Sequence, residues 1–169
     1  VAYKETITRQ VPCVVGKFIQ QTGGRGQYGH VVFKMGPAQR GEGVKFTNKI
    51  IGGAIPREYI SSVKEGVMEA ARNGTIAGYP VVDVDVILID GSFHEVDSSE
   101  IAFKMAANIA FDNGLKQGSP ILLEPIMDIE ISTPEEYLGD VIGDLNSRRA
   151  NIKDLSQKGK TKIIKAFVP

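Results

Sequence analysis

A glycine-rich run at residues 23–29, Gly-Gly-Arg-Gly-Gln-Tyr-Gly, constrains the fold of this chain more than any other segment. Its glycines at positions 24, 26 and 29 have the GxGxxG spacing of a dinucleotide-binding turn, which leaves a buried strand and opens a helix. Here the run leads instead into a strand pattern, in which Val31, Phe33 and Met35 alternate with a second set of side chains. The glycines are therefore predicted to form the turn of a β-hairpin rather than a nucleotide site.

Strand-like and helix-like segments follow one another over the first two thirds of the chain. Strands are expected over residues 2–9, 11–20, 28–36, 44–51 and 80–90. A helix is expected between the last two of these strands, because Pro56 suits a first helical turn and Asn73-Gly74 supplies a stop. This order predicts an α/β (α+β) fold class.

A second helix is expected after the strand at residues 80–90. Asp97 can cap its N-terminus, with Glu100 three residues later, and Asn113-Gly114 supplies its end. The apolar stripe that is expected to face the core consists of Ile101, Met105 and Ile109.

Carboxylates around the start of this helix could act as an acid and a base, with Glu95 and Asp97 as the pair. However, Asp97 is already explained as a helix cap, and Asp83 and Asp85 as the solvent-facing side of a strand. Carboxylate catalysis is therefore not favoured, and no catalytic residue is predicted.

Residues 114–120, Gly-Leu-Lys-Gln-Gly-Ser-Pro, are predicted to form a domain boundary. Beyond it, strands are expected over residues 121–131, 150–156 and 160–168. The helix between the first two is expected to start with a capping box of Thr133, Pro134 and Glu136, and to bury Leu138, Val141, Ile142 and Leu145. The order β-α-β-β is the first part of a ferredoxin-like βαββαβ unit. Without the last helix and strand, residues 120–169 are expected to pack poorly or to self-associate.

Charge is distributed unevenly along a chain whose formal net charge is zero. Residues 1–30 carry a balance of +3 and residues 142–165 one of +5, whereas residues 83–100 carry −6. Only the two basic regions suit a phosphate backbone. The chain has no apolar run of about 18 residues, so no membrane partner is expected.

Cofactor and metal chemistry find no support in the sequence. The chain lacks a Walker-type Gly-x-x-x-x-Gly-Lys-Ser/Thr run, so it is not expected to be an enzyme that hydrolyses a nucleoside triphosphate. His30, His94 and the single Cys13 do not have the spacing of metal ligands, and a lone cysteine excludes an intrachain disulfide. We expect His30 to face solvent or to pack against a partner, and His94 to lie in a strand-to-helix loop.

The glycine run also contains side chains that suit RNA. Arg25 can make a bidentate phosphate contact, Gln27 can bond base edges or ribose hydroxyls, and Tyr28 can stack or donate. Gly24 and Gly26 let a backbone come close to another backbone. The alternative is a hairpin tip that is rich in glycine for turn geometry only.

Several long motifs together resemble translation elongation factor G. They are Gly23–His30, Gly52–Pro56, Ala77–Asp83, Val96–Glu100 with Ala102-Phe103-Lys104, Leu123–Met127 and Gly139–Leu145. The resemblance extends over essentially the whole chain.

This resemblance implies that residues 1–119 are domain IV of the factor and that residues 120–169 are the N-terminal part of its domain V. Domain IV of this family is a two-layer α/β sandwich with a left-handed βαβ crossover, an exception to the usual hand. Domain V would be the truncated ferredoxin-like unit. The chain begins with Val1 and is expected to be a piece of a longer GTPase, with GTP and Mg bound by an upstream domain that is absent here.

The resemblance also implies a partner and a site. Domain IV would be an arm that enters the decoding site of the small ribosomal subunit while tRNA and mRNA move from the A to the P site, in the cytoplasm. Residues expected to contact RNA at its tip are Gly24, Arg25, Gly26, Gln27 and Tyr28, with His94, unmodified, at the apex of a second loop. Arg148, Arg149 and Lys153 are possible contacts of domain V with large-subunit RNA. No DNA partner is expected.

Two other functions remain open at this stage. A ribosome protection factor of the tetracycline-resistance type shares this architecture but uses different tip loops, so the glycine run favours the elongation factor. A small-molecule kinase with a related fold would bind nucleotide on a glycine-rich loop, and this alternative predicts measurable ATP binding.

Overall fold

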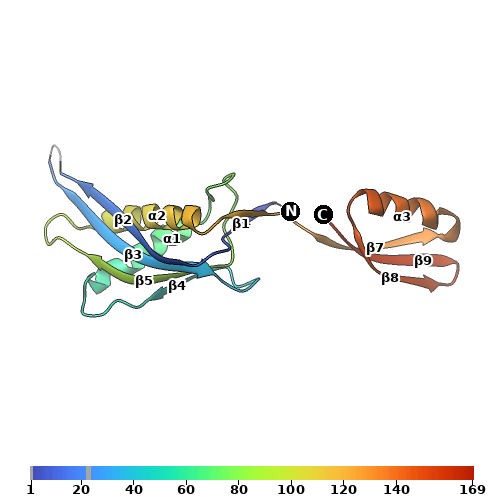
Figure 1. Cartoon of the computed structure of the whole chain (residues 1–169), viewed down its shortest axis with the longest axis horizontal. Helices are drawn as coiled ribbons and strands as arrows, with labels where there is room; N and C mark the ends of the chain where they lie inside the picture. The colour runs from blue at the N-terminus through green and yellow to red at the C-terminus, as the bar shows by residue number, and fades with distance from the viewer. Residues whose placement is uncertain (1, 22–23) are drawn as a thin grey trace. The chain divides into compact units, whose positions relative to one another are not determined.

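The computed structural model describes residues 2–21 and 24–169 (Figure 1). Val1, Thr22 and Gly23, the first residue of the glycine run, lie outside the described residues. The chain divides into two compact units, a larger one of Tyr3–Leu123 and a smaller one of Glu124–Pro169 together with Ala2. The division falls after the predicted boundary at residues 114–120, of which residues 114–117 are helical.

A four-stranded sheet organises the larger unit. Its order is β2-β3-β5-β4, with β2 at Val11–Gln20, β3 at Gln27–Pro37, β5 at Val84–Ser92 and β4 at Val44–Asn48. β2 and β3 are antiparallel, as are β3 and β5, so the predicted hairpin around the glycine run is confirmed. β4 and β5 are parallel and are connected through a 3₁₀ turn at Arg57–Tyr59 and α1 at Ile60–Ala70.

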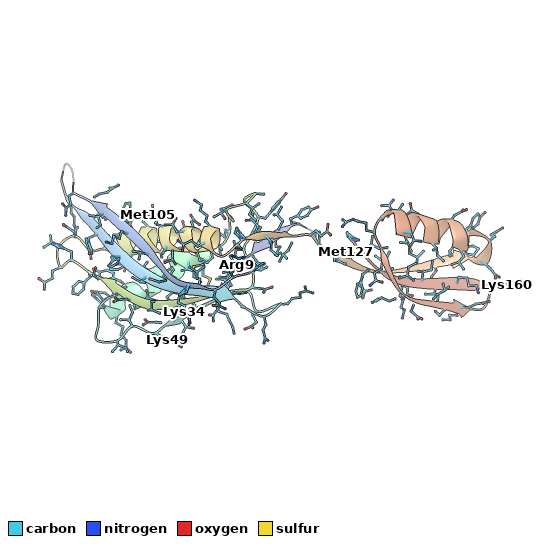
Figure 2. All side chains as sticks on the ribbon, viewed as in Figure 1. Arg9, Lys34, Lys49, Met105, Met127 and Lys160 are labelled. Atoms are coloured by element: carbon cyan, nitrogen blue, oxygen red, sulfur yellow. The ribbon has the colours of Figure 1, made fainter. Side chains whose placement is uncertain are left out.

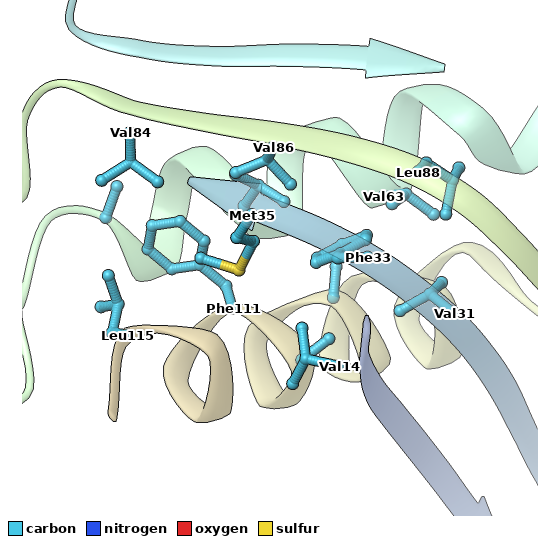
Figure 3. Close-up of a cluster of buried hydrophobic side chains, with 14 of the residues drawn as sticks. Val14, Val31, Phe33, Met35, Val63, Val84, Val86, Leu88, Phe111 and Leu115 are labelled. Atoms are coloured by element: carbon cyan, nitrogen blue, oxygen red, sulfur yellow. The ribbon is translucent and has the colours of Figure 1, made fainter. Parts of the chain in front are cut away.

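Both helices of the larger unit contribute to one core with the sheet, which gives the expected mixed α/β fold. The second helix, α2, spans Glu100–Gln117. Figure 3 shows Phe33 and Met35 of β3 beside Phe111 of α2 in this core, and all three are almost completely buried. Complete burial of one such side chain contributes about 1.5–3 kcal/mol.

The start and the end of α2 differ from the prediction. Ser99 caps the helix, because its Oγ accepts a hydrogen bond from the backbone N–H of Ala102 at 3.1 Å, so Asp97 is not the cap. The helix continues through Asn113-Gly114 to Gln117. Gly114 is retained inside it because a Cβ there would collide with the sulfur of Met35.

The predicted buried stripe of α2 is also wrong. Ile101 and Met105 are 68% and 38% exposed. The buried side consists mainly of small residues with two phenylalanines: Ala102, Phe103, Ala106, Ala107, Ala110, Phe111, Gly114 and Leu115. The reason is the close approach of the helix to the sheet, since a Cβ on Gly16 of β2 would collide with the carbonyl oxygen of Ala106. Where α2 contacts Gly16 it therefore carries the small residues Ala106 and Ala110, and larger side chains would not fit at these two positions.

Three predicted strands are shorter than expected, and one of them is β4, which ends at Asn48 rather than at residue 51. β5 starts at Val84, because Asp83 has a φ of 58° and its carboxylate accepts the N–H groups of Gly41 and Gly43 at 3.1 and 3.0 Å. Asp83 therefore does not lie on the solvent-facing side of a strand. β1 is limited to Lys4–Thr6, and it pairs with β6 at Ile121–Leu123.

Glu5 of β1 is a buried carboxylate that holds the segment after α1. It accepts hydrogen bonds from the backbone N–H groups of Ile76, Ala77 and Tyr79 at 2.9 to 3.0 Å. Burial acts to raise the pKa of Glu5, but these backbone hydrogen bonds together hold the pKa below its ordinary value.

The smaller unit contains the expected β-α-β-β order. It consists of β7 at Met127–Pro134, a 3₁₀ turn at Glu135–Tyr137, α3 at Leu138–Ser147, β8 at Asn151–Lys158 and β9 at Thr161–Val168. Its antiparallel sheet has the order β7-β9-β8, and among the described residues the second edge of β7 is unpaired. This arrangement is the incomplete ferredoxin-like unit that the sequence predicted.

Local details of the smaller unit differ from the prediction. The strand expected over residues 121–131 is split into β6 and β7, with Pro125 between them. The capping box is absent, because Thr133 belongs to β7 and its hydroxyl donates to the carbonyl oxygen of Pro134 at 3.2 Å. Of the stripe predicted for this helix, only Leu145 is fully buried.

Candidate nucleic-acid interface

The loop between β2 and β3 and the loop after β5 emerge at the same end of the sheet. β3 pairs with β5 so that His30 lies opposite Ser92, and an isolated bridge joins Tyr28 to Ser98. Figure 1 shows both loops at one end of the larger unit. The glycine run and the segment around His94 are far apart in the sequence but form one feature, which we call the tip and define as residues 24–28 and 91–99.

Two glycines allow the first loop of the tip to close against the second. Gly24 has a φ of 134°, a backbone conformation that residues with a Cβ rarely adopt. A Cβ on Gly26 would collide with the carboxylate of Asp97. Arg25 lies between them and is exposed, and it makes no ion pair or hydrogen bond with the described part of the chain. Its guanidinium group is therefore available to an external anion.

Gln27 is fixed to the start of α2 through Ser99. The hydroxyl of Ser99 accepts from the N–H of Ala102 and donates to Gln27 Oε1, both at 3.1 Å. This bond holds the carbonyl oxygen of Gln27 against α2 and thereby orients the amide nitrogen as a donor to a ligand. The helix cap thus orients a hydrogen-bond donor at the tip.

Tyr28 connects both loops. Its backbone N–H donates to the carbonyl oxygen of Asp97 at 2.9 Å, and its own carbonyl oxygen accepts from Ser98 Oγ at 3.0 Å. Its hydroxyl is 2.7 Å from Ser92 Oγ. The ring lies 6.2 Å from the ring of His94, tilted by 45°. Tyr28 is thus held in one orientation by contacts at the backbone, the hydroxyl and the ring.

His94 is oriented by backbone groups of its own loop. Its Nδ1 accepts hydrogen bonds from the N–H groups of Val96 and Asp97, at 3.2 and 3.1 Å. In this arrangement the proton lies on Nε2, and the imidazole is 52% exposed. Asp97 Oδ2 is 3.7 Å from Nδ1, but an Nδ1 that accepts two hydrogen bonds does not carry the proton of an ion pair. His94 therefore presents its Nε2–H as a donor.

Ser92 of the tip connects this network to His30 outside it, and the sequence indicated neither as a site residue. His30 Nδ1 is 2.7 Å from Ser92 Oγ, which also bonds Tyr28. Burial lowers the pKa of His30, Lys17 lowers it further, and Asp90 acts in the opposite direction. The available signal was the alternation along the strand, which puts Tyr28 and His30 on one face.

The basic residues of the smaller unit differ from Arg25 in that they are bound to carboxylates. Arg148 binds Asp144 at 2.9 Å, and Arg149 makes two hydrogen bonds to Glu124, at 3.2 and 3.0 Å. Lys153 binds Asp128 at 3.0 Å, and its ammonium lies 3.9 Å from the centre of the Phe167 ring. Each of the three cations that the sequence indicated thus has an acidic partner within the same unit.

Residues 2–21 and 24–169 contain no group of three or more His, Cys, Asp or Glu side chains that could hold a metal ion. None of the described helices has the length and the apolar character needed to cross a membrane.

Comparison with known families gives two matches, which together extend over nearly the whole chain. Residues 1–119 match the family model described as elongation factor G, domain IV. Residues 121–169 match the model described as elongation factor G C-terminus.

Individual proteins give the same result. The chain is 58% identical over all of its 169 residues to elongation factor G of Aquifex pyrophilus, of which it covers 24%. A crystal structure of a protein from Thermus thermophilus matches 99% of the chain with a TM-score of 0.90 and 42% sequence identity, and the match covers 25% of that protein. The chain thus spans about a quarter of the length of these relatives.

Proposed function

This chain belongs to the elongation factor G family, and on that basis we propose that it is the ribosome-engaging arm of a GTPase that promotes translocation of tRNA and mRNA. On this proposal the tip enters the decoding site of the small subunit in the cytoplasm, as transfer RNA moves from the A to the P site. GTP and Mg bind elsewhere in the full-length protein, and the chain itself performs no chemistry.

The observation that carries the proposal is the convergence of oriented donors at one end of a rigid sheet. The amide nitrogen of Gln27 and the Nε2 of His94 are both left to an external ligand by hydrogen bonds that fix the rest of each side chain. The exposed Arg25 adds a cation beside them. The wide minor groove of paired RNA displays 2′-hydroxyls, base edges and phosphates that such donors can bind.

The hydrogen-bond network of the tip explains how the arm could act without chemistry. Donors that are oriented before binding lose little side-chain entropy when RNA arrives. These donors are attached to the larger unit through the pairing of β3 with β5 and through the cap of α2. They therefore move together with the unit. Movement of the unit, driven elsewhere in the protein, would then move the tip against the tRNA–mRNA pairing.

A kinetic experiment tests this proposal. In the full-length protein, Gln27→Ala and His94→Ala are expected to slow single-round translocation on the ribosome by several fold each, since one net hydrogen bond contributes about 0.5–1.5 kcal/mol. The rate of GTP hydrolysis, measured in the same samples, should stay within a factor of two. Equal losses of translocation and GTP hydrolysis would contradict the proposed role of the tip.

We extend the proposal to the smaller unit, whose Arg148, Arg149 and Lys153 would contact large-subunit RNA. The basic balance of residues 142–165 supports it. Because each of these three cations is bound to a carboxylate, RNA would have to replace an existing partner. Their expected contribution is therefore smaller than that of Arg25.

A further inference from the structure

The hairpin that leads to the tip is purely basic. Residues 11–37, which comprise β2, β3 and the glycine run, contain Lys17, Arg25 and Lys34 and not one Asp or Glu. The acidic segment at residues 83–100 lies on the next strand and in the second loop. The charge of the hairpin therefore suits an anionic ligand along its length, not only at its end.

One face of this hairpin is open to solvent. The residues of β2 and β3 that point to the core, such as Phe33 and Met35, are buried against the helices. Side chains on the opposite face include Val15 and Ile19, which are 42% and 45% exposed, and the exposed Lys34, labelled in Figure 2. Within the larger unit, the described helices α1 and α2 pack on the core side and leave this face uncovered. We call the side of β2 and β3 that carries these residues the open face.

Aromatic rings continue from the tip onto the open face. Tyr28 stands beside His94 at the tip and shares Ser92 with His30, so the orientation of Tyr28 and His30 is fixed by bonds of 2.7 Å to one hydroxyl. Because they are two residues apart on one strand, they lie about 6.8 Å from each other along it. Adjacent bases of an extended single strand could therefore each meet one ring.

Side chains of β2 flank these rings in register. Lys17 pairs with His30 across the two strands, and Ile19 pairs with Tyr28. Lys17 thus lies beside the ring of His30, and Ile19 lies beside the ring of Tyr28, which belongs to the tip. A surface of this kind, with rings for bases and lysines for phosphates, is a usual means by which proteins hold single-stranded nucleic acid.

We propose that the open face is a second RNA subsite, which binds a single strand with bases stacked on Tyr28 and His30 and with phosphates at Lys17 and Lys34. The proposal rests on the proposed function in that the partner is RNA, and it extends the contact beyond the tip. Paired RNA does not fit, because the faces of its bases are already stacked. A basic protein partner is disfavoured by the charge of the hairpin.

Charged groups of both signs lie around His30. Lys17 faces it from β2, Asp90 and Ser92 from β5, and Tyr28 from its own strand. Burial and Lys17 both lower the pKa of His30. A phosphate placed between Lys17 and His30 would offset the second effect, so RNA binding should raise the pKa of His30.

Binding of a six-nucleotide oligoadenylate to the 169-residue chain tests the subsite. We expect the ring resonances of Tyr28 and His30 to shift on titration. His30→Ala should weaken binding by about fivefold or more, which corresponds to the lower end of the binding free energy that one stacked base contributes. His30→Phe, which keeps a ring but not the bond to Ser92, should bind within twofold of the parent. Lys17→Ala should weaken binding and reduce its salt dependence by about one ion.

A matched control is Thr47→Ala on β4, an exposed position in the same sheet whose change should leave binding unaltered. The proposal is overturned if Lys17→Ala and His30→Ala bind as the parent does. It is also overturned if inorganic polyphosphate competes as well as the oligonucleotide, which would show binding of any polyanion.

A failure of the subsite can be distinguished from a failure of the proposed function. Gln27→Ala should reduce translocation by the full-length protein but should leave oligonucleotide binding within twofold of the parent. Loss of translocation in that variant, with no oligonucleotide binding by the parent chain, would remove the subsite and leave the role of the tip intact.

Discussion

The larger and the smaller unit differ in how they hold their candidate RNA-binding side chains. In the larger unit, two helices and a four-stranded sheet form an extended core, and tip residues are fixed by hydrogen bonds that leave donors free. In the smaller unit, the buried apolar residues described are Leu145, Ile164 and Ala166, and the three indicated cations are bound to carboxylates. Exposed donors are thus maintained where hydrogen bonds within the tip fix the rest of each side chain.

The largest effect is expected from Phe111→Ala, which removes a fully buried ring from the core of the larger unit. Its unfolding free energy should fall by about 3–5 kcal/mol. Because the smaller unit is a separate compact body, the transition of residues 124–169 should not change. Residue-resolved urea titration by NMR measures both. A parallel loss in the two units would show that they unfold as one.

A pair of glycine substitutions should act in opposite directions. Gly16→Ala forces a Cβ against the Ala106 carbonyl and is expected to destabilise the larger unit by about 1–3 kcal/mol. Gly143→Ala, in the exposed middle of α3, meets no atom within 4 Å and should stabilise the smaller unit by about 0.5–1 kcal/mol. Thermal unfolding of both variants checks the contrast, and equal signs would contradict the close helix–sheet approach.

Acid should weaken the larger unit through Glu5. Its pKa is lower in the folded than in the unfolded state, so its stabilising contribution is complete above the unfolded value and is lost as the pH falls through the folded one. Between about pH 6 and pH 3, Glu5→Gln should therefore lose less stability than the parent chain. Denaturant titrations at several pH values measure this, and identical pH slopes would exclude Glu5 as the cause.

The smallest effects concern individual cations. Arg25→Ala should lower the salt dependence of ribosomal RNA binding by about one ion, because the Arg25 guanidinium is exposed at the tip. Arg149→Ala should change it less, since RNA would first have to displace Glu124. Filter binding over a salt series compares the two variants. A larger effect for Arg149 would reverse the contrast between the units.

Much of the fold was predictable from the sequence because it depends on local pattern. The alternation after the glycine run predicted the hairpin, and the β-α-β-β order predicted the smaller unit. The left-handed βαβ crossover was implied by the resemblance alone, and it stays a prediction. Strand order cannot be deduced from periodicity, since it depends on which distant segments pair.

Errors arose where tertiary contacts overrode local signals. Ile101 and Met105 have helical spacing and are apolar, but α2 contacts Gly16 through Ala106 and Ala110, and this orientation leaves Ile101 and Met105 exposed. Asp97 and Ser99 are both acceptable caps two residues apart, and the bond between Ser99 and Gln27 favours the second. A sequence pattern does not contain this long-range bond.

The candidate site was predictable in part. The glycine run and His94 were indicated by composition and resemblance, and the structure brings them together at one end of the sheet. Ser92, which joins Tyr28 to His30, was missed because a lone serine at a strand end has no distinctive spacing.

A cryo-EM structure of the full-length protein, held on a ribosome during translocation, would test the role of the tip directly, because it would show what the tip contacts. We predict that Gln27 and His94 lie within hydrogen-bond distance of the minor groove of the tRNA–mRNA pairing, with the hydrogen bonds within the tip retained. A complex in which the tip faces solvent or contacts only ribosomal protein would contradict this role.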